Sequence, residues 1–102
     1  MRKVTEAIAM AFLNGQSKSV SNTTTDGTRV YLHGNLIATT ENGRLQMTLA
    51  HWGTPTTRER LNGILNVFGY NSYFYQHKHE QYFNDRLITE HEWLDIPAEP
   101  MI

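Results

Sequence analysis

Three histidines in the last third of the chain are the residues whose spacing first suggests chemistry. His77 and His79 stand two positions apart, and His91 follows. His-x-His on a strand places both imidazoles on one face, where a metal ion can bind them. The acidic residues nearby are Glu80, Glu90 and Glu92. Because no third ligand stands at a fixed offset, we interpret His77 and His79 as flanking an exposed turn, and we predict no metal and no cofactor.

The sequence lacks the patterns typical of a catalytic nucleophile. Its serines, at positions 17, 19, 21 and 72, lie outside any nucleophile-elbow motif, and it has no cysteine. A phosphate-binding loop is also unsupported, because the residues after Gly34 continue as a predicted strand instead of opening a helix. We therefore predict that the protein is not an enzyme.

Trp52 and two arginines form a second candidate group. Arg58 and Arg60 lie in a threonine-rich segment that begins a predicted helix just after Trp52. A helix N-terminus beside two guanidiniums and an indole suits an anion or a nucleotide base. The alternative is a buried Trp52 that fixes the helix to the sheet while both arginines stay solvated. We favour this alternative, because a small domain needs its large aromatic residues for burial.

Tyr73, Tyr75 and Tyr82 form the third candidate group. In the hairpin predicted below, they share one face, which we call the tyrosine face. Tyrosines are enriched in contact surfaces because they bury a large area at low entropic cost and keep a hydroxyl for hydrogen bonding. Both a partner-binding role and ordinary packing with solvated hydroxyls remain open.

The first elements that position these residues follow from helical periodicity and turn signals. Residues 3–14 predict a helix, because good helix formers there place apolar residues at helical spacing and Gly15 can end it. Three dipeptides then follow at eight-residue spacing: Asp26-Gly27, Gly34-Asn35 and Asn42-Gly43. Such pairs favour two-residue hairpin turns, so we predict a four-stranded antiparallel meander.

The three turns also fix a register. The predicted pairs are Leu36 with Leu49, Ala38 with Met47, Thr40 with Leu45, Tyr31 with Ala38, His33 with Leu36, and Val20 with His33. We expect the face that carries these residues to be the core. The opposite face keeps an apolar patch, formed by Val30, Leu32 and Ile37, that a helix or a partner could cover.

A second helix is predicted to start within residues 54–59. Thr56 and Glu59 have the spacing of a capping box, and Gly69 can end the helix. Its apolar stripe consists of Leu61, Ile64, Leu65 and Phe68. Gly63 within this helix indicates either close packing or simple tolerance.

Residues 73–83 are nearly palindromic and predict a hairpin. Folding about Lys78-His79 pairs Gln76 with Gln81, Tyr75 with Tyr82, and Phe74 with Phe83. A four-residue loop from His77 to Glu80 is an open alternative. Residues 87–93 predict one further short strand.

Length and composition limit the class of protein. The chain has 102 residues, of which 39% are hydrophobic and 19% charged, so we predict a single α+β domain over 1–96 and a flexible C-terminal tail over 97–102. No apolar run approaches the roughly 20 residues that cross a bilayer, so we predict no membrane association. The net charge of −1 combines +3 in residues 1–60 with −4 in residues 61–102. This balance weakly disfavours a general DNA-binding protein.

Two segments carry a family resemblance. YLHGNLIA (31–38) and TTRERLN (56–62), with Trp52 between them, resemble a small domain of uncharacterised proteins of tailed bacteriophages. The resemblance covers about residues 20–93 and departs at 50–53, where those relatives carry a glycine before the tryptophan. It implies a viral source and the cytoplasm of the infected bacterial host, and no particular chemistry.

The sequence thus predicts an α+β fold with an N-terminal helix, a four-stranded antiparallel meander, a second helix and a C-terminal aromatic β-hairpin. We expect a non-enzymatic phage accessory protein that binds a host or phage macromolecule, with a protein favoured. The candidate contact residues are Tyr73, Tyr75, Tyr82, Trp52, Arg58 and Arg60. The alternative function is weak single-stranded nucleic-acid binding through Trp52, Arg58 and Arg60. A homodimer that pairs strand edges remains open.

Overall fold

The computed structural model describes residues 1–96, and within them the chain forms two helices and nine strands. The elements are α1 (Lys3–Leu13), β1 (Lys18–Val20), β2 (Thr23–Thr25), β3 (Arg29–Leu32), β4 (Asn35–Glu41), β5 (Arg44–Met47), α2 (Pro55–Val67), β6 (Phe74–His77), β7 (Glu80–Phe83), β8 (Arg86–Ile88) and β9 (Leu94–Ile96). The predicted α+β class is confirmed. The predicted tail at 97–102 lies outside the described residues.

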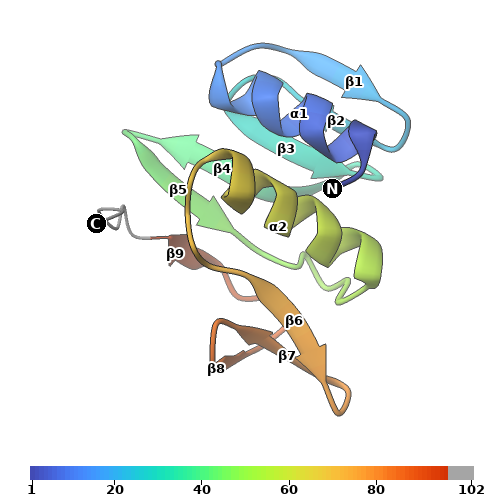
Figure 1. The fold of residues 1–102 in the computed structure, drawn as a ribbon, viewed down its shortest axis with the longest axis vertical. Coiled ribbons are helices and arrows are strands. Elements are labelled where there is room, and N and C mark those ends of the chain that lie inside the picture. The colour runs from blue at the N-terminus through green and yellow to red at the C-terminus, as the bar shows by residue number, and fades with distance from the viewer. Residues whose placement is uncertain (97–102) are drawn as a thin grey trace.

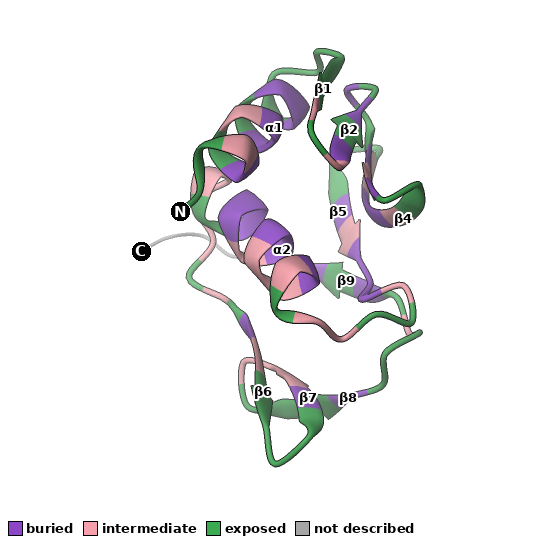
Figure 2. Cartoon of the chain, turned by 90° about the vertical axis from the view of Figure 1, so that its right-hand side faces the viewer, coloured by how far each residue is buried: buried purple, intermediate pink, exposed green. Residues whose placement is uncertain are grey.

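The strands form two sheets, and both helices lie against the larger one (Figure 1). This main sheet has the order β1-β2-β3-β4-β5-β9, with every neighbouring pair antiparallel. The small sheet, β6-β7-β8, extends from one end of the two-layered body. Burial follows this layering, because the faces that the helices and the main sheet turn toward each other are the buried ones (Figure 2).

The prediction of a four-stranded meander was wrong, because the main sheet has six strands. A left-handed residue, Ser21 (φ 55°), folds the first predicted strand into the β1–β2 hairpin, so Val20 pairs with Thr23 and not with His33. At the other end, β9 pairs with β5. The strand predicted within residues 87–93 was therefore placed wrongly, because the chain there leaves β8 and joins the main sheet only at 94–96.

The turn at Asn42-Gly43 is confirmed, since Ala38 pairs with Met47 and Thr40 with Leu45 as predicted. The turn between β2 and β3 lies one residue later than predicted. The Asp26 N–H donates to the Arg29 carbonyl oxygen at 3.2 Å, which leaves Gly27 and Thr28 as the turn residues.

The turn between β3 and β4 lies one residue earlier than predicted, at His33-Gly34. Leu32 pairs with Asn35, and both turn residues are left-handed, with φ of 50° and 81°. Moving a two-residue turn by one position changes each cross-strand partner by two residues and leaves the faces of both strands as they were. Tyr31 consequently pairs with Leu36, not with Ala38, and both are only half-buried.

The apolar patch predicted on the outer face of the sheet does not exist, because Val30, Leu32 and Ile37 are all buried. The register shift between Val30 and Tyr31 explains this burial, because a slip of one residue turns β3 over relative to the rest of the sheet. The same shift gives β4 one extra residue, so that Ile37 and Ala38 both face the core. The predicted core residues Ala38, Leu45, Met47 and Leu49 are buried as expected.

Helix α2 begins after Thr54, whose hydroxyl accepts the Thr57 N–H at 3.2 Å. The predicted capping box of Thr56 and Glu59 is therefore wrong. Gly63 reflects close packing, because a Cβ at this position would overlap the Thr5 methyl group of α1. The two helices thus approach closely at a residue without a side chain, and the predicted stripe of Leu61, Ile64 and Leu65 is buried beneath them.

Candidate functional site

The predicted aromatic hairpin is confirmed and forms two of the three strands of the small sheet. Phe74 pairs with Phe83 and Tyr75 with Tyr82, about a two-residue turn. The turn residues Lys78 and His79 have φ of 50° and 68°. Such left-handed pairs match the natural twist of a hairpin, which explains how the turn forms without glycine.

Polar side chains join the inner face of the small sheet to the N-terminal part of α2. Arg58 Nη1 donates to Gly53 O at 2.8 Å and to Gln76 Oε1 and Gln81 Oε1, each at 3.1 Å. Gln81, itself buried, also donates to Gln76 Oε1 at 2.8 Å. Burial lowers the pKa of the Arg58 guanidinium, which nonetheless remains charged at neutral pH. Arg58 is thus part of the scaffold beneath the sheet.

Asn62 makes the second attachment between α2 and the small sheet. Its amide nitrogen donates to Phe74 O at 2.9 Å, and its amide oxygen accepts the Phe74 N–H at 2.6 Å. The side chain therefore replaces a neighbouring strand for one residue of β6. The phenyl ring of Phe74 is buried and lies 4.9 Å from that of Phe83.

The outer face of the small sheet carries the tyrosine face of Tyr73, Tyr75 and Tyr82. The rings of Tyr75 and Tyr82 stack with 5.1 Å between centroids and 10° between planes. Tyr73 lies 5.4 Å from Tyr75 and is 52% exposed. The structure thus joins the three predicted tyrosines in one continuous, solvent-accessible row.

Two neighbours extend the tyrosine face. Leu87 on β8 pairs with Tyr82 and is 56% exposed, so an aliphatic side chain lies next to the stacked rings. The Tyr75 hydroxyl donates to Asp85 Oδ1 at 3.5 Å. Desolvation, followed by the negative charge of Asp85, raises the pKa of Tyr75. Sequence reasoning missed Leu87, although the alternation in β8 would have indicated it once that strand was recognised.

Arg60 does not accompany Arg58 or Trp52 at the surface. It is 3% exposed and donates to Thr23 Oγ1 at 2.9 Å and to Thr5 Oγ1 at 2.8 Å. It also donates to Asn22 and pairs with Glu59. The expectation that both arginines are solvated was wrong, because Arg60 connects α1, α2 and β2. Its spacing from Thr57 and Ile64, three and four residues away, is the signal that could have placed it on the buried face.

Glu59 completes this internal network. Burial raises the pKa of Glu59, but hydrogen bonds from Thr5, from the Arg2 N–H and from Arg60 outweigh that effect and hold the pKa below its ordinary value. The carboxylate is therefore ionised at neutral pH and stabilises the buried guanidinium of Arg60. This network is a structural feature of the fold.

Trp52 is exposed, contrary to the prediction that it is buried. It is 57% exposed and follows two left-handed residues, Ala50 (φ 54°) and His51 (φ 69°). The Trp52 N–H donates to Leu49 O at 2.9 Å, which closes the turn. Glycine adopts this conformation without strain, and neither of the two positions carries one.

The histidines do not form a metal site in the described residues. His77 and His79 are exposed at the hairpin turn, as interpreted from the sequence. His91 stacks on His51 with 5.5 Å between ring centroids. Within residues 1–96, no three His, Asp or Glu side chains are grouped so as to hold a metal ion.

The geometry defines a small α+β domain that presents a row of aromatic side chains on a subsidiary sheet. A family model described as Kyanoviridae Gp96 protein matches residues 1–97, and the chain belongs to this bacteriophage protein family. The resemblance to phage proteins is thereby confirmed. No curated protein and no solved structure matches the chain. No helix in the described part of the chain is long and apolar enough to span a membrane.

Proposed function

We propose that this phage protein is a non-enzymatic accessory protein that binds a host or phage protein through the tyrosine face. The observation that carries the proposal is the accessible stack of Tyr73, Tyr75 and Tyr82. Stacked tyrosines offer a large contact area and hydroxyl groups while losing little side-chain entropy on binding.

The tyrosine face is also held rigid before a partner arrives. Cross-strand stacking orders Tyr75 and Tyr82, and the opposite face of the same strands is attached to α2 through Asn62 and Arg58. Preorganisation lowers the entropy lost on association, so it favours a tighter complex for a given area. A polar attachment on one face and free aromatic rings on the other is the arrangement expected of a contact surface.

The surroundings of the tyrosine face suit a protein partner. Leu87 adds an apolar neighbour, whereas the exposed residues around it include Asp85 and Arg86. An apolar centre with a charged rim is typical of protein–protein interfaces. The two halves of the chain contribute opposite net charges, and the small sheet belongs to the acidic half. Within the small sheet, Lys78 and Arg86 are balanced by Glu80 and Asp85, and the lack of excess cations supports a protein partner over a nucleic acid.

The alternative of single-stranded nucleic-acid binding through Trp52, Arg58 and Arg60 has weaker support. Trp52 is exposed and available for base stacking, but Arg60 is buried and Arg58 makes three internal hydrogen bonds. Phosphate binding needs cations that can reach the backbone. We expect oligothymidylate to leave Trp52 fluorescence unchanged at low salt; salt-sensitive quenching would support the alternative.

The binding proposal is tested by photo-crosslinking in infected cells. A benzophenone amino acid replaces Tyr73, the most exposed of the three tyrosines, and in a matched protein it replaces Tyr31 on the outer face of β3. We expect a distinct protein to be crosslinked from position 73 and not from position 31. Identical products from both positions, or no product from position 73, would contradict the proposal.

A further inference from the structure

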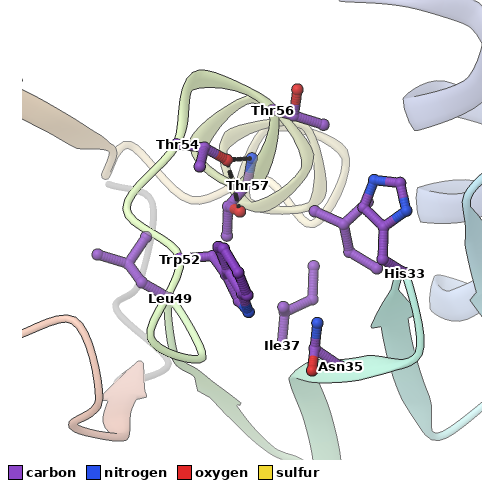
Figure 3. Close-up of a pocket in the computed structure, with 9 residues that line it drawn as sticks. His33, Asn35, Ile37, Leu49, Trp52, Thr54, Thr56 and Thr57 are labelled. Carbon is purple, nitrogen blue, oxygen red and sulfur yellow. Dashed lines mark hydrogen bonds between the residues drawn. The ribbon is translucent and has the colours of Figure 1, made fainter.

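A pocket beside Trp52 is separate from the tyrosine face and has the size of a small-molecule site. It has a volume of about 410 Å³ and lies between the main sheet and the first turn of α2 (Figure 3). Pockets that bind small molecules range from about 300 to 1,000 Å³. The two segments that carry the family resemblance meet here, since His33 and Asn35 come from one and Thr56 and Thr57 from the other.

Two aromatic rings stand on opposite sides of this pocket. Figure 3 shows Trp52 on one side and His33 on the other, with Ile37 and Asn35 between them. Each ring belongs to a turn with left-handed residues: His33 has φ 50°, and His51 just before Trp52 has φ 69°. The His33-Gly34 turn thus places the His33 ring, and the turn closed by the Trp52 N–H places the indole.

The chemistry of the lining indicates an uncharged ligand. The base is apolar, formed by Leu32, Ile37 and Leu49, and no Asp, Glu, Lys or Arg is among the lining residues that the structure describes. The start of the helix offers little to an anion, because Pro55 has no N–H and Thr54 already accepts the Thr57 N–H. Asn35 is exposed at the rim, and in Figure 3 its amide nitrogen faces the cavity.

We propose that this pocket binds a neutral, planar aromatic molecule. The ring inserts over Ile37 and stacks on the Trp52 indole, while the Asn35 amide hydrogen-bonds to a polar atom on the edge of the ring. Flat π-systems gain from stacking in addition to burial, which is what an exposed tryptophan above an apolar base offers. The absence of a lining charge selects against phosphorylated forms of the same ring.

The chain supplies its own reporter, because it contains two tryptophans and both are exposed, Trp52 at 57% and Trp93 at 44%. In a ¹H–¹⁵N spectrum each gives one indole N–H signal, and the signals are assigned with the Trp52→Leu and Trp93→Leu variants. The probes are indole, adenosine, adenosine monophosphate and cyclohexanol. Comparing indole with cyclohexanol tests whether the ligand must be planar. Adenosine adds hydrogen-bonding groups to a planar ring, and adenosine monophosphate adds charge.

We expect indole and adenosine to shift the Trp52 signal saturably in the low millimolar range or below, with Trp93 unmoved. The Asn35→Ala substitution lowers the affinity for adenosine several-fold more than the affinity for indole. Adenosine monophosphate binds no more tightly than adenosine. Each of four results overturns the proposal: no saturable shift, equal shifts of both tryptophans, cyclohexanol binding as well as indole, or tighter binding of the phosphate. A Trp52 shift on dilution of the protein alone would assign the pocket to a second copy and also overturn it.

Discussion

The side-chain amide of Asn62 pairs with both backbone polar groups of Phe74, at 2.9 and 2.6 Å, and so joins α2 to the first strand of the small sheet. Together with Arg58, this helical side chain thus holds the sheet that carries the tyrosine face.

Replacing Asn62 by alanine removes both hydrogen bonds. We expect Asn62→Ala to lower the free energy of unfolding by about 2 kcal/mol, since each net hydrogen bond contributes about 1 kcal/mol. Hydrogen exchange of the β6–β8 amides should accelerate more than that of the main sheet. Asn66→Ala, at an exposed position one turn later, is the control and should be neutral. Equal losses in the two variants would contradict the role of Asn62.

Gly63 is the point of closest approach of the two helices. Alanine favours a helix over glycine by about 1 kcal/mol, yet we expect Gly63→Ala to destabilise the protein by about 2 kcal/mol because its Cβ overlaps the Thr5 methyl. Combining it with Thr5→Ser, which removes that methyl and keeps the hydroxyl, should recover most of the loss. Denaturant unfolding measures the free energy of unfolding of the single and the double mutant. A double mutant no more stable than Gly63→Ala would contradict the overlap.

Arg60 donates hydrogen bonds to three elements from a buried position. We expect Arg60→Met to lower the free energy of unfolding by about 3 kcal/mol or more, because the buried hydroxyls of Thr5 and Thr23 and the Glu59 carboxylate lose their partner. Arg44→Met breaks the exposed pair of Arg44 with Asp95 and should cost at most about 1 kcal/mol. Chemical denaturation of the two variants makes the comparison; similar losses would refute a buried network.

Glu59 gives the stability a predictable pH dependence. Its pKa is held below the ordinary value of 4.5, so the folded state binds the proton less readily than the unfolded state does. The stabilising contribution is complete above that ordinary value and is lost as the pH falls through the lower, folded-state pKa. We expect Glu59→Gln to lower stability at neutral pH and to flatten the acid limb of the stability curve.

Glu6→Gln, at an exposed position on α1, provides the control for this pH series. It should leave the curve close to that of the wild type. Asp26 contributes to the acid limb in both variants, because N–H donors led by that of Thr28 lower its pKa as well. An acid limb in Glu59→Gln as steep as in the wild type would show that Glu59 does not control it.

Local signals predicted the elements more accurately than the faces of the strands. Asn42-Gly43 and the palindrome about Lys78-His79 gave the correct pairing, because each has a single arrangement that satisfies every cross-strand pair. The segment His33-Gly34-Asn35 offers two possible turns one residue apart. The choice between them changed the partners of β3, and no local signal announced the extra residue in β4 that exchanged the faces of β3.

The candidate site was predictable where it depended on neighbours in sequence. The tyrosine face follows from strand alternation and hairpin pairing alone. The burial of Arg60 depends instead on Thr5 and Thr23, which are distant in the sequence. The exposure of Trp52 depends on the left-handed turn at Ala50 and His51, where neither residue type indicates that conformation.

Binding of a protein by the tyrosine face is measured as the affinity of the protein crosslinked from position 73 for purified variants. Tyr75→Ala and Tyr82→Ala, each confirmed as folded by thermal unfolding, should weaken binding by roughly 30-fold, as expected of interface residues worth about 2 kcal/mol. Tyr31→Ala, a half-buried tyrosine of the main sheet, should leave the affinity unchanged. Undiminished binding by both tyrosine-face variants, or an equal loss in Tyr31→Ala, would contradict the claim.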